Sequence, residues 1–245
     1  YKIRIEYMQA GAEALLRFDL GVYRHISPEM VVDRVKEADI VIFAGGISPS
    51  LEGEEMYSVN SPGFAGGDRT SIELPQVQRD ILKALKKAGK KVVFVNCSGS
   101  AVALVPEMES CDAILQAWYP GQAGGLAVAD VLFGDFNPSG KLPVTFYKNT
   151  DQLPDFEDYS MKNRTYRYMT EVPLFPFGYG LSYTTFDISK GRLNKKTISA
   201  GQDLNFKVNV KNTGTREGQE VVQLYISDKK SSLPRPVKEL KGFQK

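Results

Sequence analysis

The stretch Asp39-Ile40-Val41-Ile42-Phe43-Ala44-Gly45-Gly46 indicates the fold class of this 245-residue chain. Its short, continuous apolar run is typical of a strand buried on both faces, as in a parallel sheet, and the two glycines end it. The residues before it, 28–38, have apolar side chains at helical spacing. A helix followed by a buried strand is the repeating unit of α/β proteins.

The same pattern returns twice further along the chain. Residues 75–88 predict a helix that ends at Gly89, and a strand over 91–96 follows it. Residues 113–118 predict a third strand, which a helix over 124–133 follows. Strands that alternate with helices predict a parallel sheet covered on both faces, with ligands bound by the loops at the carboxyl ends of its strands.

The chain is expected to contain three parts. They are an α/β-sandwich domain, truncated at its N-terminus, over residues 1–150, an aromatic and proline-rich connector over 151–185, and the start of an immunoglobulin-like β-sandwich over 186–245. The connector is expected to be packed, because its many aromatic side chains favour burial. The alternating segments 204–210 and 221–226 predict strands of the sandwich, whose roughly sixty residues fall short of the ~100 typical of that fold.

Both ends of the chain are expected to be those of a fragment. Residues 1–7 alternate like a strand and show neither an initiator Met nor a signal peptide. The last residues, 240–245, stop within the β-rich region.

Composition excludes several classes of partner. The 31 basic and 29 acidic residues give a net charge of +2 that is spread along the chain, which argues against nucleic acid and against anionic membranes. No apolar run is long enough to span a membrane. Cys97 and Cys111 are too few for a zinc site and are interpreted as small buried residues, with a single disulfide between them as the open alternative. His25, the only histidine, is interpreted as structural.

A cluster of carboxylates is the main candidate for chemistry. Glu52, Glu54 and Glu55 lie on a loop that leaves the carboxyl end of the strand over 40–44. Like-charge crowding raises a carboxyl pKa, which is what a general acid needs. A solvated acidic surface is the alternative. Nearby, Arg69 is predicted to hold a carboxylate or a substrate hydroxyl, with a purely structural ion pair as the equal alternative.

Trp118, the only tryptophan, lies at the carboxyl end of the third predicted strand. It has the chemistry to stack on a sugar face, but a core position is the favoured interpretation. The glycine-rich segments 121–125 and 134–142 do not match phosphate-binding loops, which disfavours a nucleotide-binding protein.

Five linked motifs then occur in a fixed order. They are Glu52-Gly53-Glu54-Glu55 with Gly67-Asp68-Arg69 and Leu74-Pro75-x-x-Gln78; Ala117-Trp118-Tyr119-Pro120-Gly121-Gln122-Ala123-Gly124-Gly125; Ala129-Asp130-Val131-Leu132-Phe133-Gly134; Asn137-Pro138-Ser139-Gly140-Lys141-Leu142-Pro143; and Phe175-Pro176-Phe177-Gly178-Tyr179-Gly180-Leu181-Ser182-Tyr183-Thr184. Together they resemble glycoside hydrolase family 3 over essentially the whole chain. The resemblance implies most of the α/β-sandwich domain and the start of a fibronectin type III-like domain.

The resemblance also implies roles for residues. The family's acid/base glutamate falls on Glu54, and Glu55, Met56 and Arg69 are the implied substrate-binding residues. Glu55 stands where the family often has glycine, and a long insert over 56–65 precedes the Asp-Arg pair. The role of Glu54 is therefore open to a shift to Glu52 or Glu55. The nucleophile is an aspartate of the family's barrel domain, which this chain lacks, so the chain alone is expected to be inactive.

The implied activity is that of a retaining, exo-acting β-glycosidase. Release of xylose from xylo-oligosaccharides is favoured, with β-glucosidase as the alternative, and a non-catalytic carbohydrate-binding or scaffold module as the competing class. The resemblance implies no cofactor and no metal. The expected partners are an oligosaccharide and the N-terminal barrel domain of the same polypeptide, and the expected compartment is periplasmic or extracellular.

Overall fold

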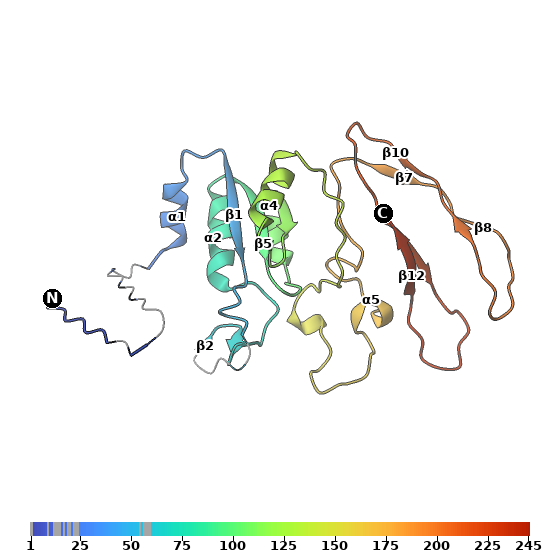
Figure 1. Cartoon of the computed structure of the whole chain (residues 1–245), viewed down its shortest axis with the longest axis horizontal. Helices are drawn as coiled ribbons and strands as arrows, with labels where there is room; N and C mark the ends of the chain where they lie inside the picture. Colours follow the sequence, from blue (N-terminus) through green and yellow to red (C-terminus); the bar gives the residue numbers. More distant parts are fainter. Residues whose placement is uncertain are drawn as a thin grey trace.

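A computed structural model of the chain describes residues 2–8, 10–11, 16, 18, 21, 25–53, 55 and 60–245. An α/β part and a β-rich part lie side by side, with the segment that connects them between the two (Figure 1). No helix in the described ranges is both long and apolar enough to cross a membrane.

The α/β part is built on a three-stranded parallel sheet. Its strands are β1 (Ile40–Gly46), β5 (Lys91–Cys97) and β6 (Ala113–Gln116), in the order β1-β5-β6. Because both pairings are parallel, all three carboxyl ends meet at one edge of the sheet. This edge is the lower one in Figure 1, where the chain leaves β1.

Four helices accompany this sheet: α1 (Pro28–Arg34), α2 (Gln76–Lys87), α3 (Val105–Ser110) and α4 (Gly124–Phe133). The Ser27 hydroxyl caps α1, and α2 buries Leu82 and Leu85 against the sheet. Gly134, with φ of 84°, ends α4 in the left-handed conformation that glycine adopts without strain. The predicted parallel α/β architecture is confirmed, although α3 had not been predicted.

The expectation that the first strand is buried on both faces is wrong. Ile40 and Ile42 are 56% and 51% exposed. The reason is position, because β1 is an edge strand and the described helices leave this part of its surface uncovered. The central strand β5 has the expected burial, with Val92 and Phe94 inaccessible to solvent.

Two boundaries and one predicted strand also differ from the sequence patterns. Helix α1 ends at Arg34 rather than at residue 38. Strand β6 ends at Gln116, because Trp118 has φ of 57° and a strand cannot continue through a left-handed residue. Residues 2–8 belong to no sheet, since alternation alone does not form a strand without a neighbour to take its backbone hydrogen bonds.

A small antiparallel sheet lies below the carboxyl end of β1. It contains β2 (Asn60–Ser61), β3 (Phe64–Ala65) and β4 (Asp68–Arg69) in that order. Phe64 is buried in the main core, so this sheet is fastened to the α/β part.

The connecting segment includes the 3₁₀ turn η1 (Thr150–Gln152) and α5 (Thr165–Tyr168). Aromatic rings pack along only part of it, because Phe156 and Tyr159 are 91% and 89% exposed, so the expected packing does not hold throughout. Phe146 contacts Phe175 edge to face at 6.3 Å between ring centroids, and Phe175 stacks on Tyr179 at 4.9 Å.

Both Cys97 and Cys111 are free thiols, so no disulfide joins them, and burial raises the pKa of Cys111 to about 12.

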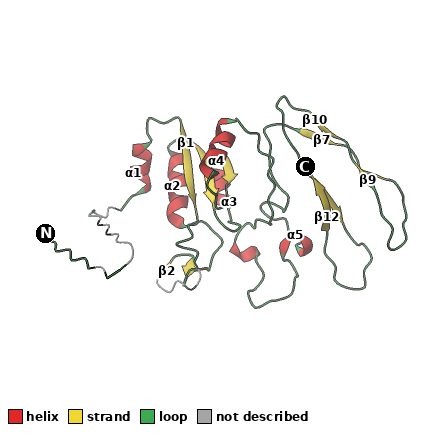
Figure 2. Cartoon of the chain, viewed as in Figure 1, coloured by secondary structure: helices red, strands yellow, loops and turns green. Residues whose placement is uncertain are grey.

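The β-rich part contains antiparallel pairs (Figure 2). Its strands are β7 (Phe186–Ile188), β8 (Arg192–Leu193), β9 (Phe206–Lys207), β10 (Val210–Asn212), β11 (Val222–Ile226) and β12 (Glu239–Gln244). They pair as β7 with β10, β8 with β9, and β11 with β12. The predicted β-sandwich start is confirmed.

Candidate active site

The candidate site lies where the loops from the three parallel strands meet. Strand β1 ends at Gly46, whose φ of 127° turns the chain into the carboxylate-bearing loop. A Cβ at Gly46 would collide with the Cys97 carbonyl, so this position requires glycine. Gln78 on α2 binds both main-chain groups of Gly46, accepting from its N–H at 2.8 Å and donating to its oxygen at 2.7 Å.

Glu52 follows directly in a compact turn. The backbone N–H groups of Leu51 and Glu52 donate to the Ser48 carbonyl at 2.9 and 3.1 Å. The Ser48 hydroxyl accepts from the Ser50 N–H at 3.2 Å. These bonds define the backbone of the turn and direct the Glu52 carboxylate toward the loops that follow β5 and β6.

Arg69, at the end of β4, lies next to the same carboxylate. Its Nη1 lies 3.7 Å from Glu52 Oε1 and donates to the Ser100 hydroxyl at 2.7 Å. The Ser100 hydroxyl donates in turn to Glu52 Oε1 at 3.1 Å. The Arg69 Nη1 also donates to the Ala101 carbonyl at 3.1 Å, and its Nε to the Ser71 carbonyl at 3.3 Å. The ion-pair alternative for Arg69 is therefore present in the structure.

Tyr119, from the loop after β6, completes the group. Its hydroxyl lies 3.0 Å from the Ile47 carbonyl and 3.4 Å from Glu52 Oε2, so its one hydrogen is shared between two acceptors. A Cβ at Gly99 would collide with the Tyr119 ring, so the close approach of this ring depends on glycine. The neighbouring Trp118 packs edge to face on Phe146 at 6.0 Å, which supports the core interpretation.

The surroundings shift the pKa values of two of these groups. Burial lowers the pKa of the Arg69 guanidinium, while the charges of Glu52 and Glu73 oppose the shift. The neighbouring carboxylates thus favour the charged form of Arg69. Burial also raises the pKa of Tyr119, and the negative charge of Glu52 adds to the rise. Tyr119 thus keeps its proton and serves as a donor.

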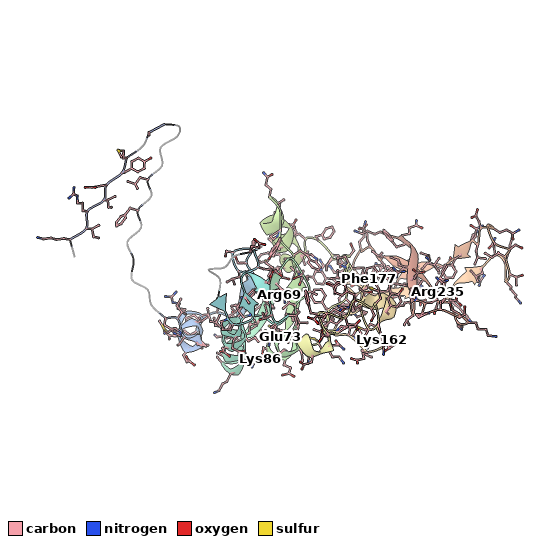
Figure 3. The ribbon with its side chains drawn as sticks, turned by 90° about the horizontal axis from the view of Figure 1, so that it is seen from below. Arg69, Glu73, Lys86, Lys162, Phe177 and Arg235 are labelled. Carbon is pink, nitrogen blue, oxygen red and sulfur yellow. The ribbon has the colours of Figure 1, made fainter. Side chains whose placement is uncertain are left out.

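Glu73 fastens the segment that follows Arg69. The Thr150 N–H donates to Oε1 at 3.0 Å and the Thr150 hydroxyl to Oε2 at 2.7 Å, and the Ser71 hydroxyl also donates to Oε2. Burial on its own would raise the pKa of Glu73, but these donors outweigh it and lower the pKa to about 2. Figure 3, seen from the lower side of Figure 1, shows Arg69 and Glu73 near each other in the α/β part.

Of the other three predicted site residues, the structure describes only Glu55. Glu54 and Met56 lie outside the described residues. Glu55 is exposed and has φ of 48°, a conformation rare for residues other than glycine. The substrate-binding role of Arg69, Glu55 and Met56 stays a prediction.

Sequence reasoning had assigned no role to Ser100 or Tyr119. Both lie just past the carboxyl ends of their strands, β5 and β6, which is the signal that could have identified them. The structure brings these two residues together with Glu52 and Arg69. We call these four residues the Glu52 cluster.

Comparison with known families agrees with this architecture. The model of the glycosyl hydrolase family 3 C-terminal domain matches residues 7–183, and that of the fibronectin type III-like domain matches residues 220–245. The chain belongs to glycoside hydrolase family 3. The resemblance seen in its motifs is thereby confirmed.

Known family 3 proteins are similar to this chain over most of its length. It is 59% identical to a xylan 1,4-β-xylosidase from Xylanibacter ruminicola, over 95% of this chain and 26% of that protein. It is 42% identical to a periplasmic β-glucosidase from Salmonella typhimurium, over 89% of this chain and 29% of that protein. A solved β-glucosidase from Erythrobacter marinus superposes with a TM-score of 0.76 at 40% identity, covering 89% of this chain and 28% of that one. This family 3 chain thus spans between a quarter and a third of the length of these relatives.

Proposed function

We propose that the chain supplies the general acid/base of a retaining, exo-acting β-glycosidase. The supporting observation is a carboxylate-bearing loop that leaves the carboxyl edge of the parallel sheet, beside Arg69, in a family 3 chain. Loops at this edge are where α/β sheets bind ligands. In this proposal Glu54 is the acid/base, and Glu55, Met56 and Arg69 contact the substrate.

The chemistry follows the two-carboxylate scheme of retaining glycosidases. Glu54 first protonates the glycosidic oxygen, while a nucleophilic carboxylate from another part of the polypeptide attacks the anomeric carbon. Glu54 then takes a proton from the water that hydrolyses the glycosyl-enzyme. The two carboxyl groups would lie about 5 to 5.5 Å apart for this outcome.

The favoured substrate is a xylo-oligosaccharide, cleaved from its non-reducing end. Support comes from the 59% identity to a protein named xylan 1,4-β-xylosidase. A β-glucoside is the second candidate, because other relatives are β-glucosidases. No cofactor is needed for this acid/base chemistry.

We further propose that the chain works as part of a longer polypeptide whose N-terminal barrel provides the nucleophile. Residues 1–150 would be its α/β-sandwich domain, 151–185 the connector, and 186–245 the start of the fibronectin type III-like domain. The proposed compartment is the periplasm or the exterior of the cell, which the name of one relative, a periplasmic β-glucosidase, supports.

The test is Glu54→Ala in the polypeptide that carries this chain. Loss of a general acid costs about 10² to 10⁴-fold and falls mainly on substrates with poor leaving groups, because activated aryl glycosides need little protonation. Azide is expected to restore turnover of the activated substrates by attacking the glycosyl-enzyme. Glu109→Ala, on the exposed side of α3, is the matched control and is expected to behave as wild type.

Two outcomes would point elsewhere. The azide-rescued pattern in Glu55→Ala but not in Glu54→Ala would move the acid/base role within the loop. Sugar binding without any hydrolysis by the polypeptide would favour the competing class, a non-catalytic carbohydrate-binding module.

A further inference from the structure

We propose that Glu52 is a positioning residue which anchors the carboxylate-bearing loop to the sheet edge, with Arg69, Ser100 and Tyr119 as its anchor points. The inference rests on the proposed function for its kinetic consequence, but the anchoring itself is a property of this chain. It gives a task of its own to Glu52, which the sequence analysis kept as an alternative to Glu54 for the proton donor.

Three side chains surround the Glu52 carboxylate in the described part of the chain. Oε1 of Glu52 accepts from the Ser100 hydroxyl at 3.1 Å and lies 3.7 Å from Arg69 Nη1, and Oε2 lies 3.4 Å from the Tyr119 hydroxyl. The described neighbours of the carboxylate are thus a cation and two hydroxyls that point donors at it. A carboxylate held in this way acts as an acceptor, whereas a general acid must present its own proton to the leaving oxygen.

The pair of Glu52 and Arg69 is largely buried. The Glu52 and Arg69 side chains are 25% and 10% exposed. The Nη2 of Arg69 is buried and has no partner in the described part of the chain, while its Nη1 and Nε donate to protein oxygens that hold the guanidinium in place. An ion pair that is screened from water in this way holds its geometry better than an exposed pair.

Glu52 and its partners come from different loops at the sheet edge. Glu52 belongs to the loop after β1, Ser100 to the loop after β5, and Tyr119 to the loop after β6. Arg69 adds the small sheet, because it lies at the end of β4. The Glu52 carboxylate therefore links all three sheet-edge loops and the small antiparallel sheet of β2, β3 and β4. Glu52 lies two residues before Glu54 in the chain.

Ser100 itself is held by a buried network, which makes it a firm anchor point. The Ser100 carbonyl accepts from the Ser98 hydroxyl at 2.9 Å. Ser98 and Asn96 are inaccessible to solvent, and the Asn96 amide donates to Gln116 Oε1 at 2.6 Å. Displacement of Ser100 would disturb this network, so the position of Glu52 is set by the end of the sheet.

The first arm of the test measures fluorescence and amide exchange of the 245-residue chain, so it does not require glycosidase activity. Trp118, its only tryptophan, is adjacent to Tyr119 and reports on the loop after β6. Glu52→Gln keeps the size of the side chain but removes its charge. We expect altered Trp118 emission, greater quenching by acrylamide, and faster amide exchange over residues 48–53, with an unchanged far-ultraviolet circular dichroism spectrum. Glu109→Gln is the matched control and is expected to change none of these signals.

If Glu52→Gln fails to fold, Tyr119→Phe replaces it. This variant removes only one hydroxyl and is expected to give the same exchange increase over residues 48–53 at smaller amplitude. Unchanged exchange and unchanged fluorescence in a folded variant would overturn the anchoring.

The second arm measures hydrolysis by the polypeptide that carries this chain. A displaced acid/base costs up to about 10²-fold. We expect Glu52→Gln to lower kcat for unactivated aryl glycosides by about 10 to 100-fold and for activated ones by less, with KM little changed, because a displaced Glu54 fails first where protonation is needed. In a polypeptide that already carries Glu54→Ala, Glu52→Gln is expected to lower kcat little further, because its effect passes through Glu54. A full loss in Glu52→Gln that persists in the Glu54→Ala background, with Glu54→Ala alone behaving as wild type, would make Glu52 the proton donor and overturn the proposal. A polypeptide without glycosidase activity would refute the proposed function, while the first arm would still decide the anchoring.

Discussion

Lys141 and Glu220 form a 2.7 Å ion pair between the α/β part and the β-rich part of the chain. Their side chains are only 13% and 17% exposed, and the Lys141 ammonium also donates to the Gly180 carbonyl at 2.8 Å. Partner residues 79 positions apart in the sequence are thus held together in a region that largely excludes water.

Removal of either member of this pair is expected to destabilise the chain. Lys141→Met and Glu220→Gln should each lower the free energy of unfolding by about 1 to 3 kcal/mol, because each leaves a partly buried charge without its partner. The double variant should lose less than the sum of the two. Urea unfolding of the four proteins measures this coupling.

The exposed pair of Lys86 and Asp112 is the control. Its atoms lie 3.4 Å apart and both side chains are 46% exposed, so a coupling of less than about 1 kcal/mol is expected. Equal coupling in the two pairs would show that burial does not strengthen the link between Lys141 and Glu220.

Glu73 should make the stability of the chain depend on pH in the acidic range. Its pKa is lowered to about 2 in the folded chain, against an ordinary value of 4.5. Its carboxylate therefore contributes stability that is present above about pH 4.5 and is lost as the pH falls toward 2. The contribution is about 1 to 2 kcal/mol after solvent screening at this half-buried position.

Glu73→Gln tests this contribution. Wild type should exceed the variant in unfolding free energy at pH 7, and the difference should shrink as the pH falls from about 4.5 toward 2. Chemical unfolding at several pH values measures it. A difference independent of pH would mean that the shape of the side chain matters, rather than its charge.

Gln78 should stabilise the turn that starts the candidate site. Gln78→Ala removes two hydrogen bonds to Gly46 and is expected to cost about 1 to 3 kcal/mol. Gly46→Ala should cost more, about 3 kcal/mol or above, because its Cβ meets the Cys97 backbone at a positive φ.

Gln76→Ala on the same helix is the matched control. Its amide donates to Asp80 on the exposed surface, a contact worth about 0.5 kcal/mol or less. Thermal unfolding ranks the three variants. Equal losses for Gln76→Ala and Gln78→Ala would show that the contacts to Gly46 do not hold the turn.

The order of helices and strands was predictable because each element carries its own local pattern. The helix over Gln76–Lys87 and the strand over Lys91–Cys97 have apolar periodicities that depend only on neighbouring residues. The exposure of Ile40 depends instead on what covers β1, and the end of β6 on the left-handed backbone of Trp118. Neither the exposure of Ile40 nor the end of β6 can be predicted from the residues next to it in the sequence.

The candidate site, too, could be predicted from the sequence only in part. The loop of glutamates could be placed at the sheet edge, because strand direction fixes which loops meet there. The partners of Glu52 could not, since Ser100 and Tyr119 are 48 and 67 positions away and their contacts depend on how the loops turn. Sequence reasoning therefore placed the acid/base on Glu54 and kept Glu52 and Glu55 as alternatives, without assigning Glu52 a separate role.

The 245-residue chain on its own should hydrolyse neither aryl β-xylosides nor aryl β-glucosides. In the proposed mechanism it supplies the acid/base but not the nucleophile, and an acid without a nucleophile cannot form the glycosyl-enzyme. Release of nitrophenol is measured with the purified chain, whose folding is checked by circular dichroism. The polypeptide that also carries the barrel is the positive control. Appreciable turnover by the chain alone, abolished by replacing an aspartate within it, would contradict the division of the two catalytic carboxylates between different parts of the polypeptide.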